Sequence, residues 1–178
     1  MKSTEGHRQP EIVLAVFFVL AGAILRFLPH PDNFTPVTAL ALFSGAFLSR
    51  RLSVAVPLLI MMITDFFIGF HSVIWFTWGS FVLTVFLGRR VSDDAGEWRR
   101  VAPASLSGSL LFFVVTNFGH FVMTNSYPHT WQGFWMCYTF AVPFFRNTLL
   151  GDLFYTTILF GLFVGVRQGL RRQLSPVL

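Results

Sequence analysis

Long apolar segments separated by short polar ones run along the whole chain, and six of these segments have the length and character of helices. A helix that crosses the hydrocarbon core of a membrane needs about 20 apolar residues, and shorter spans occur. The apolar runs are continuous rather than alternating, which favours helices over the strands of a membrane barrel. We therefore predict an all-α integral membrane protein with one transmembrane domain over residues 1–178 and spans at about 12–28, 35–48, 53–69, 73–88, 104–123 and 144–166.

The N-terminus has a second interpretation. Lys2 and Arg8 precede an apolar run that is followed by Ala21, Gly22 and Ala23, a pattern that resembles a signal peptide with its cleavage site. The apolar run continues beyond that site, and its removal would leave an odd number of spans, so we retain this segment as the first helix.

The composition supports a membrane protein. Of the 178 residues, 54% are hydrophobic and 12% are charged, whereas soluble domains carry about 25% charged residues. Such a chain is not expected to bind nucleic acid or to act as a cytosolic enzyme. With a single cysteine, Cys137, it can form no intramolecular disulfide and no cysteine-based zinc site.

The basic residues predict the orientation, because Lys and Arg are concentrated in cytoplasmic segments. If both termini are cytoplasmic, 11 of the 13 basic residues lie on the cytoplasmic side. They are Lys2, Arg8, Arg50, Arg51, Arg89, Arg90, Arg99, Arg100, Arg167, Arg171 and Arg172. We interpret them as orientation and lipid anchors in a multi-pass protein of the bacterial inner membrane.

The charges inside the spans gather in their outer halves. Arg26, Asp65, Arg146 and Asp152 all occur there, and ionisable groups at membrane depth usually face a bundle interior or a watery cavity. Neutral polar residues of the same half and of the outer loops join them. We predict an outward-facing ligand site formed by Asn33, Thr35, Asp65, His71, Asn117, His120, Arg146 and Asp152.

Two structural alternatives stay open for these residues. The charges could form ion pairs that only lock helices together, such as Arg26 with Asp152 or Arg146 with Asp65, and the amides could link helices.

The aromatic segment 130–141 also has two interpretations. It could form a helix on the membrane surface and close over a ligand, or it could simply belong to the interfacial aromatic belt.

The start of the second helix adds to the outer site. Asp32 and Asn33 are capping residue types, and Pro36 follows in the expected first turn. A helix N-terminus there would offer free N–H groups to an anionic or amide-bearing ligand. Ala41 and Gly45, four residues apart, indicate close packing of this helix against a neighbour.

Five segments carry a resemblance to a known family. They read RFLPHPDNFTPVTALALFSGAF, ITDFFIGFH, WGSFVLTVFLG, VTNFGHF and CYTFAVPFFRNTLLGDLFYTTILFG, and together they extend from about Arg26 to Phe163. The chain resembles the S-components of energy-coupling-factor vitamin transporters, and within them the BtuM family of solitary cobalamin transporters. The resemblance implies a six-helix bundle that captures a vitamin at its outer face.

The resemblance also implies partners. An S-component that docks an energising ATPase module usually carries Ala-x3-Ala in its first helix, and this spacing is absent here, which favours a solitary mode or a different partner. Cobalamin members can use a cysteine as cobalt ligand, but segment 71–81 has none. His71, His120 or Cys137 could ligate cobalt instead.

We therefore predict an uptake transporter for a vitamin, cobalamin or a related corrinoid above all, which would be its transported ligand rather than a prosthetic group. Its partners would be this small molecule and the lipid bilayer, and the resemblance adds an energising ATPase module as a further candidate. Two alternatives remain: a non-transporting membrane subunit that binds a partner protein, and an intramembrane enzyme that uses His120, Asp65 and Cys137.

Overall fold

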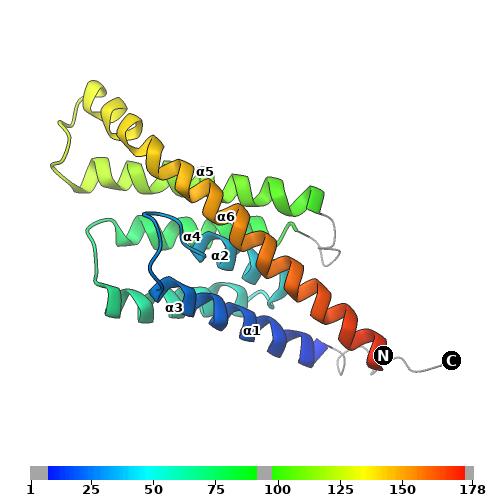
Figure 1. Ribbon diagram of the computed structural model, residues 1–178. Coiled ribbons are helices and arrows are strands. Elements are labelled where there is room, and N and C mark those ends of the chain that lie inside the picture. Colours follow the sequence, from blue (N-terminus) through cyan, green and yellow to red (C-terminus); the bar gives the residue numbers. More distant parts are fainter. Residues whose placement is uncertain (1–7, 92–97, 175–178) are drawn as a thin grey trace.

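A computed structural model describes residues 8–91 and 98–174 of the chain (Figure 1). Within these residues there are six α-helices and one short 3-10 helix. They are α1 (Arg8–Ile24), η1 (Leu25–Phe27), α2 (Val37–Phe47), α3 (Leu52–Ile68), α4 (Ile74–Gly88), α5 (Trp98–Met123) and α6 (Trp131–Leu174). The first residues of α1 and the last residues of α6 lie at the same end of the bundle (Figure 1).

The short helix α2 occupies the centre of the bundle. It contacts α1, α3, α4, α5 and α6, and every residue from Val37 to Gly45 is buried. Its 11 residues give a length of about 17 Å. The non-helical segment 28–36 connects η1 to α2. In this segment Asn33 adopts a left-handed backbone conformation with φ 61°.

Two glycines allow α2 to approach α4 closely. A Cβ atom at Gly45 would lie 2.2 Å from the backbone oxygen of Val85, and one at Gly88 would lie 2.1 Å from that of Leu42. Neither oxygen can move without moving its helix. The small-residue spacing on the second helix therefore corresponds to a real close contact between two helix backbones.

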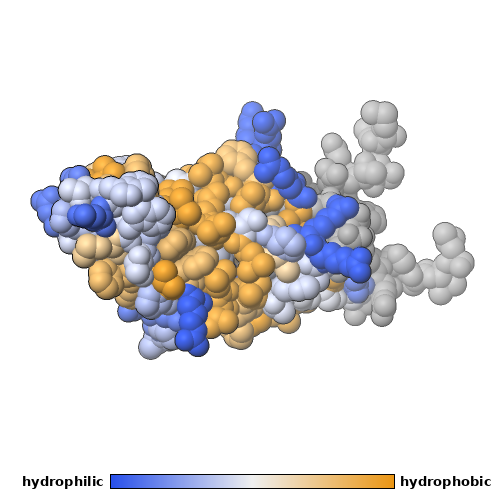
Figure 2. Space-filling model, turned by 90° about the horizontal axis from the view of Figure 1, so that it is seen from above, coloured by the Kyte–Doolittle hydropathy of each residue, from blue (hydrophilic) through white to orange (hydrophobic). Residues whose placement is uncertain are grey.

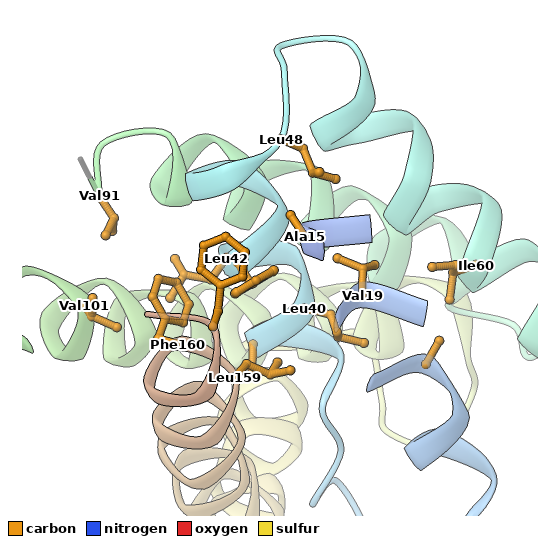
Figure 3. Close-up of a cluster of buried hydrophobic side chains, with 14 residues drawn as sticks. Ala15, Val19, Leu40, Leu42, Leu48, Ile60, Val91, Val101, Leu159 and Phe160 are labelled. Atoms are coloured by element: carbon orange, nitrogen blue, oxygen red, sulfur yellow. The ribbon is translucent and has the colours of Figure 1, made fainter. Parts of the chain in front are cut away.

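An apolar cluster fills the half of the bundle nearer to the chain ends. Phe43 of α2 is fully buried against Phe160 and Phe163 of α6, with ring centroids 5.4 and 5.1 Å apart. Ala15 and Val19 of α1 complete the cluster, which Figure 3 shows around α2. Packing of this density closes the bundle on this side.

The outer surface of the bundle is strongly apolar. Figure 2 shows a hydrophobic zone across the middle of one face, with hydrophilic residues toward both ends. Large apolar side chains such as Phe66, Phe67 and Trp75 are about 70% exposed. Two helices, α5 and the part of α6 up to Leu170, are long and apolar enough to cross a membrane.

Helix α6 is much longer than the span predicted for it. The structure has one continuous helix of 44 residues from Trp131 to Leu174, where a surface helix over 130–141 and a separate span over 144–166 are the sequence-based expectations. Pro143 marks the expected boundary, but it lies inside α6. A proline removes one helical hydrogen bond and can be accommodated in a long helix that neighbours hold in place.

The other boundaries differ less. Helices α2, α3 and α4 lie within two residues of their predicted bounds. Helix α5 begins at Trp98 instead of 104 and contains Pro103, while α1 ends at Ile24 and continues as the 3-10 helix to Phe27. The middle of the polar gap between the fourth and fifth spans, residues 92–97, lies outside the described residues.

Candidate functional site

A pocket of about 400 Å³ lies above the N-terminus of α2, at the end of the bundle opposite to the apolar cluster. Residues of α3 and α4 line one side of it, and residues of α5 and α6 line the other. Phe112 and Phe113 of α5 and Phe144 and Phe145 of α6 provide much of its apolar wall. The volume falls in the lower part of the range of about 300–1,000 Å³ that is typical of small-molecule sites.

Five of the eight predicted site residues line this pocket. They come from three separate parts of the chain and are Asn33, Thr35, His71, Asn117 and His120. The first two belong to the segment that leads into α2, His71 to the α3–α4 turn and the last two to one face of α5. The fold thus brings together residues that lie far apart in the sequence.

Asn117 and His120 present different chemistry to the pocket. The Asn117 side-chain amide donates a hydrogen bond to the backbone oxygen of Phe113 at 2.7 Å, which fixes the orientation of the amide. The His120 ring makes an edge-on contact with the ring of Tyr127, with centroids 6.1 Å apart. Both side chains are half-buried and can hydrogen-bond to a ligand.

Asp65 lies behind the pocket wall and is held in an ion pair. Its carboxylate accepts a hydrogen bond from Arg26 Nη2 at 2.8 Å and one from Trp78 Nε1 at 2.8 Å. The Arg26 guanidinium also contacts Thr64 Oγ1 and Met61 Sδ. The Asp65 side chain is only 3% exposed, and the Arg26 side chain, 12% exposed, is the one that reaches the pocket.

This ion pair differs from both pairings considered from the sequence, which joined Arg26 to Asp152 or Arg146 to Asp65. The reason is position along the helix axes. Arg26 in η1 and Asp65, one turn before the end of α3, lie at the same level, so that their side chains meet at 2.8 Å. Helix α3 ends at Gly69, whose N–H donates to the Asp65 backbone oxygen and whose φ of 112° few other residues adopt readily.

Asp152 and Arg146 do not line the pocket. Asp152 is 1% exposed and points between α6 and α5, where Ser109 Oγ donates to its Oδ2 at 2.6 Å. Arg146 is exposed on the outside of α6. Arg146 and Asp152 are close in sequence to Phe145 and Thr148, which line the pocket, but they lie on other faces of α6.

Polar groups without negative charge surround the pocket. Within the described residues no carboxylate lines it, and its ionisable side chains are Arg26, His71 and His120. The pocket lining also includes the hydroxyl groups of Thr77, Thr116 and Thr148. Below them α2 begins at Val37, and its N-cap residue Pro36 provides no side-chain cap, contrary to the capping expected from Asp32 and Asn33. Since Thr35 and Val37 line the pocket, the positive end of this helix is directed toward it.

The three threonines and Arg26 are site residues that the sequence-based set lacks. Arg26 carries a signal, since it is a cation inside the first predicted span. Thr116 is adjacent to Asn117 and one turn from His120 on the same helix. Thr77 and Thr148 carry no comparable signal, because a lone threonine in an apolar helix is most often bonded to its own backbone, as Thr148 is to Phe144.

The aromatic segment forms the first turns of α6 and packs on α5. Trp131 stacks on Phe134 with centroids 5.7 Å apart, and Tyr138 donates a hydrogen bond to the Val114 backbone oxygen at 2.8 Å. Cys137 is buried with its thiol 3.6 Å from the Asn117 backbone oxygen. This thiol does not line the pocket, so of the three suggested cobalt ligands His71 and His120 are the ones that do.

Within the described residues no three His, Cys, Asp or Glu side chains come together in a way that could hold a metal ion. The trio considered for an intramembrane enzyme is also not assembled at the pocket, where only His120 is present. Asp65 and Cys137 are engaged elsewhere.

Comparison with family models gives one match. Residues 7–174 match the model described as "Family of unknown function (DUF6580)". The chain belongs to this family. No curated protein and no solved structure matches the chain. For this DUF6580 chain the pocket itself is therefore the basis of a functional proposal.

Proposed function

We propose that this DUF6580 chain is a multi-pass protein of the bacterial inner membrane that takes up a small molecule, of vitamin size, through an outward-facing pocket. The observation that carries the proposal is a pocket lined by dispersed polar side chains at one end of a helical bundle, with apolar packing at the other end. This arrangement is typical of a binding site open to one side and differs from a continuous polar channel.

The membrane assignment is supported by exposed apolar surface on the two longest helices. In the most apolar stretch of α5 only 22% of the residues are buried, and in that of α6 only 33%. A long apolar helix in the core of a soluble protein would be mostly buried. Lipid is the environment in which such exposure carries no cost.

The short helix α2 fits this assignment because other helices surround it. At about 17 Å it is too short for a hydrocarbon core of about 30 Å. Non-helical backbone at membrane depth is tolerated where protein buries it or where it lines a cavity. The part of segment 28–36 next to α2 meets these conditions, since Pro36 is fully buried and Asn33 and Thr35 line the pocket, whereas residues 28–32 are exposed at the end of the bundle.

In the proposed topology both ends of the chain are cytoplasmic and the pocket faces outward. The positive ends of the bundle agree with this orientation: Arg50, Arg51, Arg89 and Arg90 flank the ends of α2, α3 and α4 opposite to the pocket. Arg89 donates to the Arg50 backbone oxygen at 2.7 Å and to Ser53 Oγ at 2.9 Å, which ties this end together.

The ligand class follows from the lining. Amide, hydroxyl and imidazole groups without a carboxylate favour a ligand rich in hydrogen-bonding groups that is neutral or negatively charged, and the phenylalanines would contact its apolar faces. The resemblance to vitamin S-components supports the same class. The absent Ala-x3-Ala spacing favours a solitary mode or a partner other than the shared energising module.

A corrinoid is the second candidate within this class, and a specific observation favours it. His71 and His120 both line the pocket, and imidazole is a suitable ligand for cobalt. Against it stands the size of the pocket, because a cobalamin with its nucleotide tail is far larger than the ligands that a 400 Å³ pocket encloses. A corrinoid would have to bind partly outside the pocket or widen it.

Growth rescue of a bacterial strain that lacks its own vitamin uptake tests this function. The strain is grown on limiting amounts of single vitamins, cyanocobalamin among them, with the wild-type chain, N117A, H120A or the control R99A. We expect the wild type and R99A to restore growth on one vitamin, and both pocket variants to restore it at least tenfold less well at equal membrane abundance. Normal growth with the pocket variants and failure with R99A would instead place the function at the cytoplasmic face.

A further inference from the structure

Asp152 is a buried carboxylate without a cationic partner. It lies near the middle of α6 and is 1% exposed. Within the described residues Asp65 forms an ion pair with Arg26, whereas the side-chain partners given for Asp152 are the hydroxyls of Ser109 and Thr38. A buried charge normally requires a partner, and an ionisable residue at membrane depth indicates a function rather than a packing role.

The groups around Asp152 are neutral hydroxyls. Ser109 of α5 donates to its Oδ2 at 2.6 Å, and Thr38 of α2 provides a second side-chain hydrogen bond. One turn further along the helices, Ser105 and Thr156 are 3.1 Å apart through their hydroxyl oxygens and are both buried. Four hydroxyls from three helices thus surround or adjoin one carboxylate.

On the parts of α2, α5 and α6 that the structure describes, no other titratable side chain faces this group, and α1 has none from Ile12 to Ile24. The sequence of α2 contains none at all, and α5 contains none between Arg100 and His120. On α6 the nearest are Arg146, which is exposed, and Tyr155, whose ring packs against Phe34. Any change of charge at this site is therefore a change of Asp152 alone.

Ser109 can bond to Asp152 in both protonation states. Its Oγ lies 2.6 Å from Asp152 Oδ2 and 3.1 Å from the Ser105 backbone oxygen, and a hydroxyl has one hydrogen to donate. When the carboxylate is ionised, Ser109 donates to it. When the carboxyl is protonated, its O–H can donate to Ser109 Oγ, and the serine hydrogen can turn to the Ser105 oxygen. Both states exist without movement of a heavy atom.

Asp152 also lies directly behind the pocket. Thr148, four residues before it on α6, lines the pocket, which places the carboxylate about 6 Å further along the helix axis. Thr156, four residues after it, lies on the other side, toward the end of α6. The 2.6 Å contact between Ser109 Oγ and Asp152 Oδ2 is a direct hydrogen bond of ordinary charge-assisted length, which leaves no place for a metal ion between these two oxygens.

We propose that Asp152 is a proton-binding site that couples proton entry to uptake of the ligand, an inference that rests on the proposed transport function. The carboxylate takes up one proton from water on the pocket side and becomes a neutral carboxylic acid. It returns to the carboxylate when the bundle opens inward and that proton leaves to the cytoplasmic side, a route that the apolar cluster closes in the outward-facing arrangement. One positive charge enters the cell in each such cycle, which would supply energy to a transporter that lacks the usual docking spacing for an ATPase module.

The proton-binding step can be tested without knowledge of the ligand. Infrared spectra of the purified full-length protein in lipid nanodiscs are recorded across pH for the wild type, D152N and D32N, with buffers that contain either sodium or choline. Asp32 is exposed and serves as the matched control. We expect a protonated-carboxyl band at about pH 6, where exposed carboxyls are ionised, that disappears at higher pH, is absent in D152N and is retained in D32N.

Several results would overturn the proposal. They are the absence of this band from the wild type, its retention in D152N, and its loss on addition of sodium, which would indicate a sodium site. The variant S109A provides a measurement that does not depend on the folding of D152N. It removes a donor to the ionised form, so the band should persist to higher pH, and an unchanged titration would contradict the role given to Ser109.

The coupling step is then tested in the rescued strain. D152N should reach the membrane and retain a bound ligand but support at least tenfold less growth than the wild type. Growth equal to the wild type would refute coupling. If no vitamin supports growth with any variant while the infrared band behaves as described, the transport function fails and the proton site stands, so the two failures can be told apart.

Discussion

Replacing Asp65 by asparagine isolates the one described ion pair at the pocket. The change is nearly isosteric, but it removes the charge opposite Arg26 and introduces an N–H₂ group where two donors, Arg26 Nη2 and Trp78 Nε1, each need an acceptor at 2.8 Å. Both ionic side chains are largely buried, at 12% and 3% exposure. Breaking a buried pair by removing one partner typically costs about 3–5 kcal/mol, because the other charge stays buried and unpaired.

The cost is measured by reversible unfolding in mixed micelles of increasing denaturing detergent. We expect D65N to lower the free energy of unfolding by about 3–5 kcal/mol. The double variant R26Q/D65N should recover most of this loss, because no unpaired charge remains. The control D32N, at an exposed position, should change it by less than about 0.5 kcal/mol.

If D65N lowered the free energy of unfolding by less than about 1 kcal/mol, the range of an exposed ion pair, the pair would not be a buried one. A double variant R26Q/D65N no more stable than D65N would equally contradict the cost of an unpaired Arg26. Because Arg26 lines the pocket, the double variant is assessed for stability only, and its ligand binding is a separate question.

Further predictions concern packing, burial and orientation. G45A should lower the free energy of unfolding by about 1–3 kcal/mol, because the new Cβ would lie 2.2 Å from the Val85 oxygen. The control G79A, whose Cβ would have nothing within 4 Å, should be neutral or slightly stabilising. Equal effects of the two variants would contradict the close α2–α4 contact. D152N should cost about 1 kcal/mol, the value of one altered hydrogen bond, since no cation loses its partner, and a loss as large as in D65N would reveal one. In intact cells an epitope tag beside Tyr127 should be accessible from outside and a C-terminal tag should not; an accessible C-terminus would refute the proposed topology.

The parts of the fold that could be predicted are those set by local sequence. Continuous apolar runs and their polar breaks place α2, α3 and α4 within two residues. The extent of α6 could not be predicted, because a proline such as Pro143 ends some helices and lies inside others, and the neighbouring helix α5 decides between these outcomes. The central place of α2 is likewise a property of the whole bundle, although Gly45 signals its close packing.

The candidate site shows the same division. Asn117 and His120 share a helix face, so their approach to one another follows from the helical repeat. The pairing of charges does not follow from the helical repeat, because it depends on how α1, α3 and α6 are placed relative to one another along the bundle axis. The ion pairs considered as an alternative joined Arg26 to Asp152 and Arg146 to Asp65, whereas Asp65 pairs with Arg26 and the partners of Asp152 are the hydroxyls of Ser109 and Thr38. Serines and threonines are too common in membrane helices to reveal such a cluster from sequence alone.

The most direct test of the outward pocket is to purify the chain from bacterial membranes in a mild detergent and to identify by mass spectrometry the small molecule that it retains. We predict a vitamin or vitamin precursor in the wild type and in R99A, at close to one molecule per chain, and its loss from N117A and H120A of equal thermal stability. A red protein would identify the ligand as a corrinoid. A wild-type protein without any retained or added vitamin bound, or pocket variants that bind as the wild type does, would contradict the proposed site.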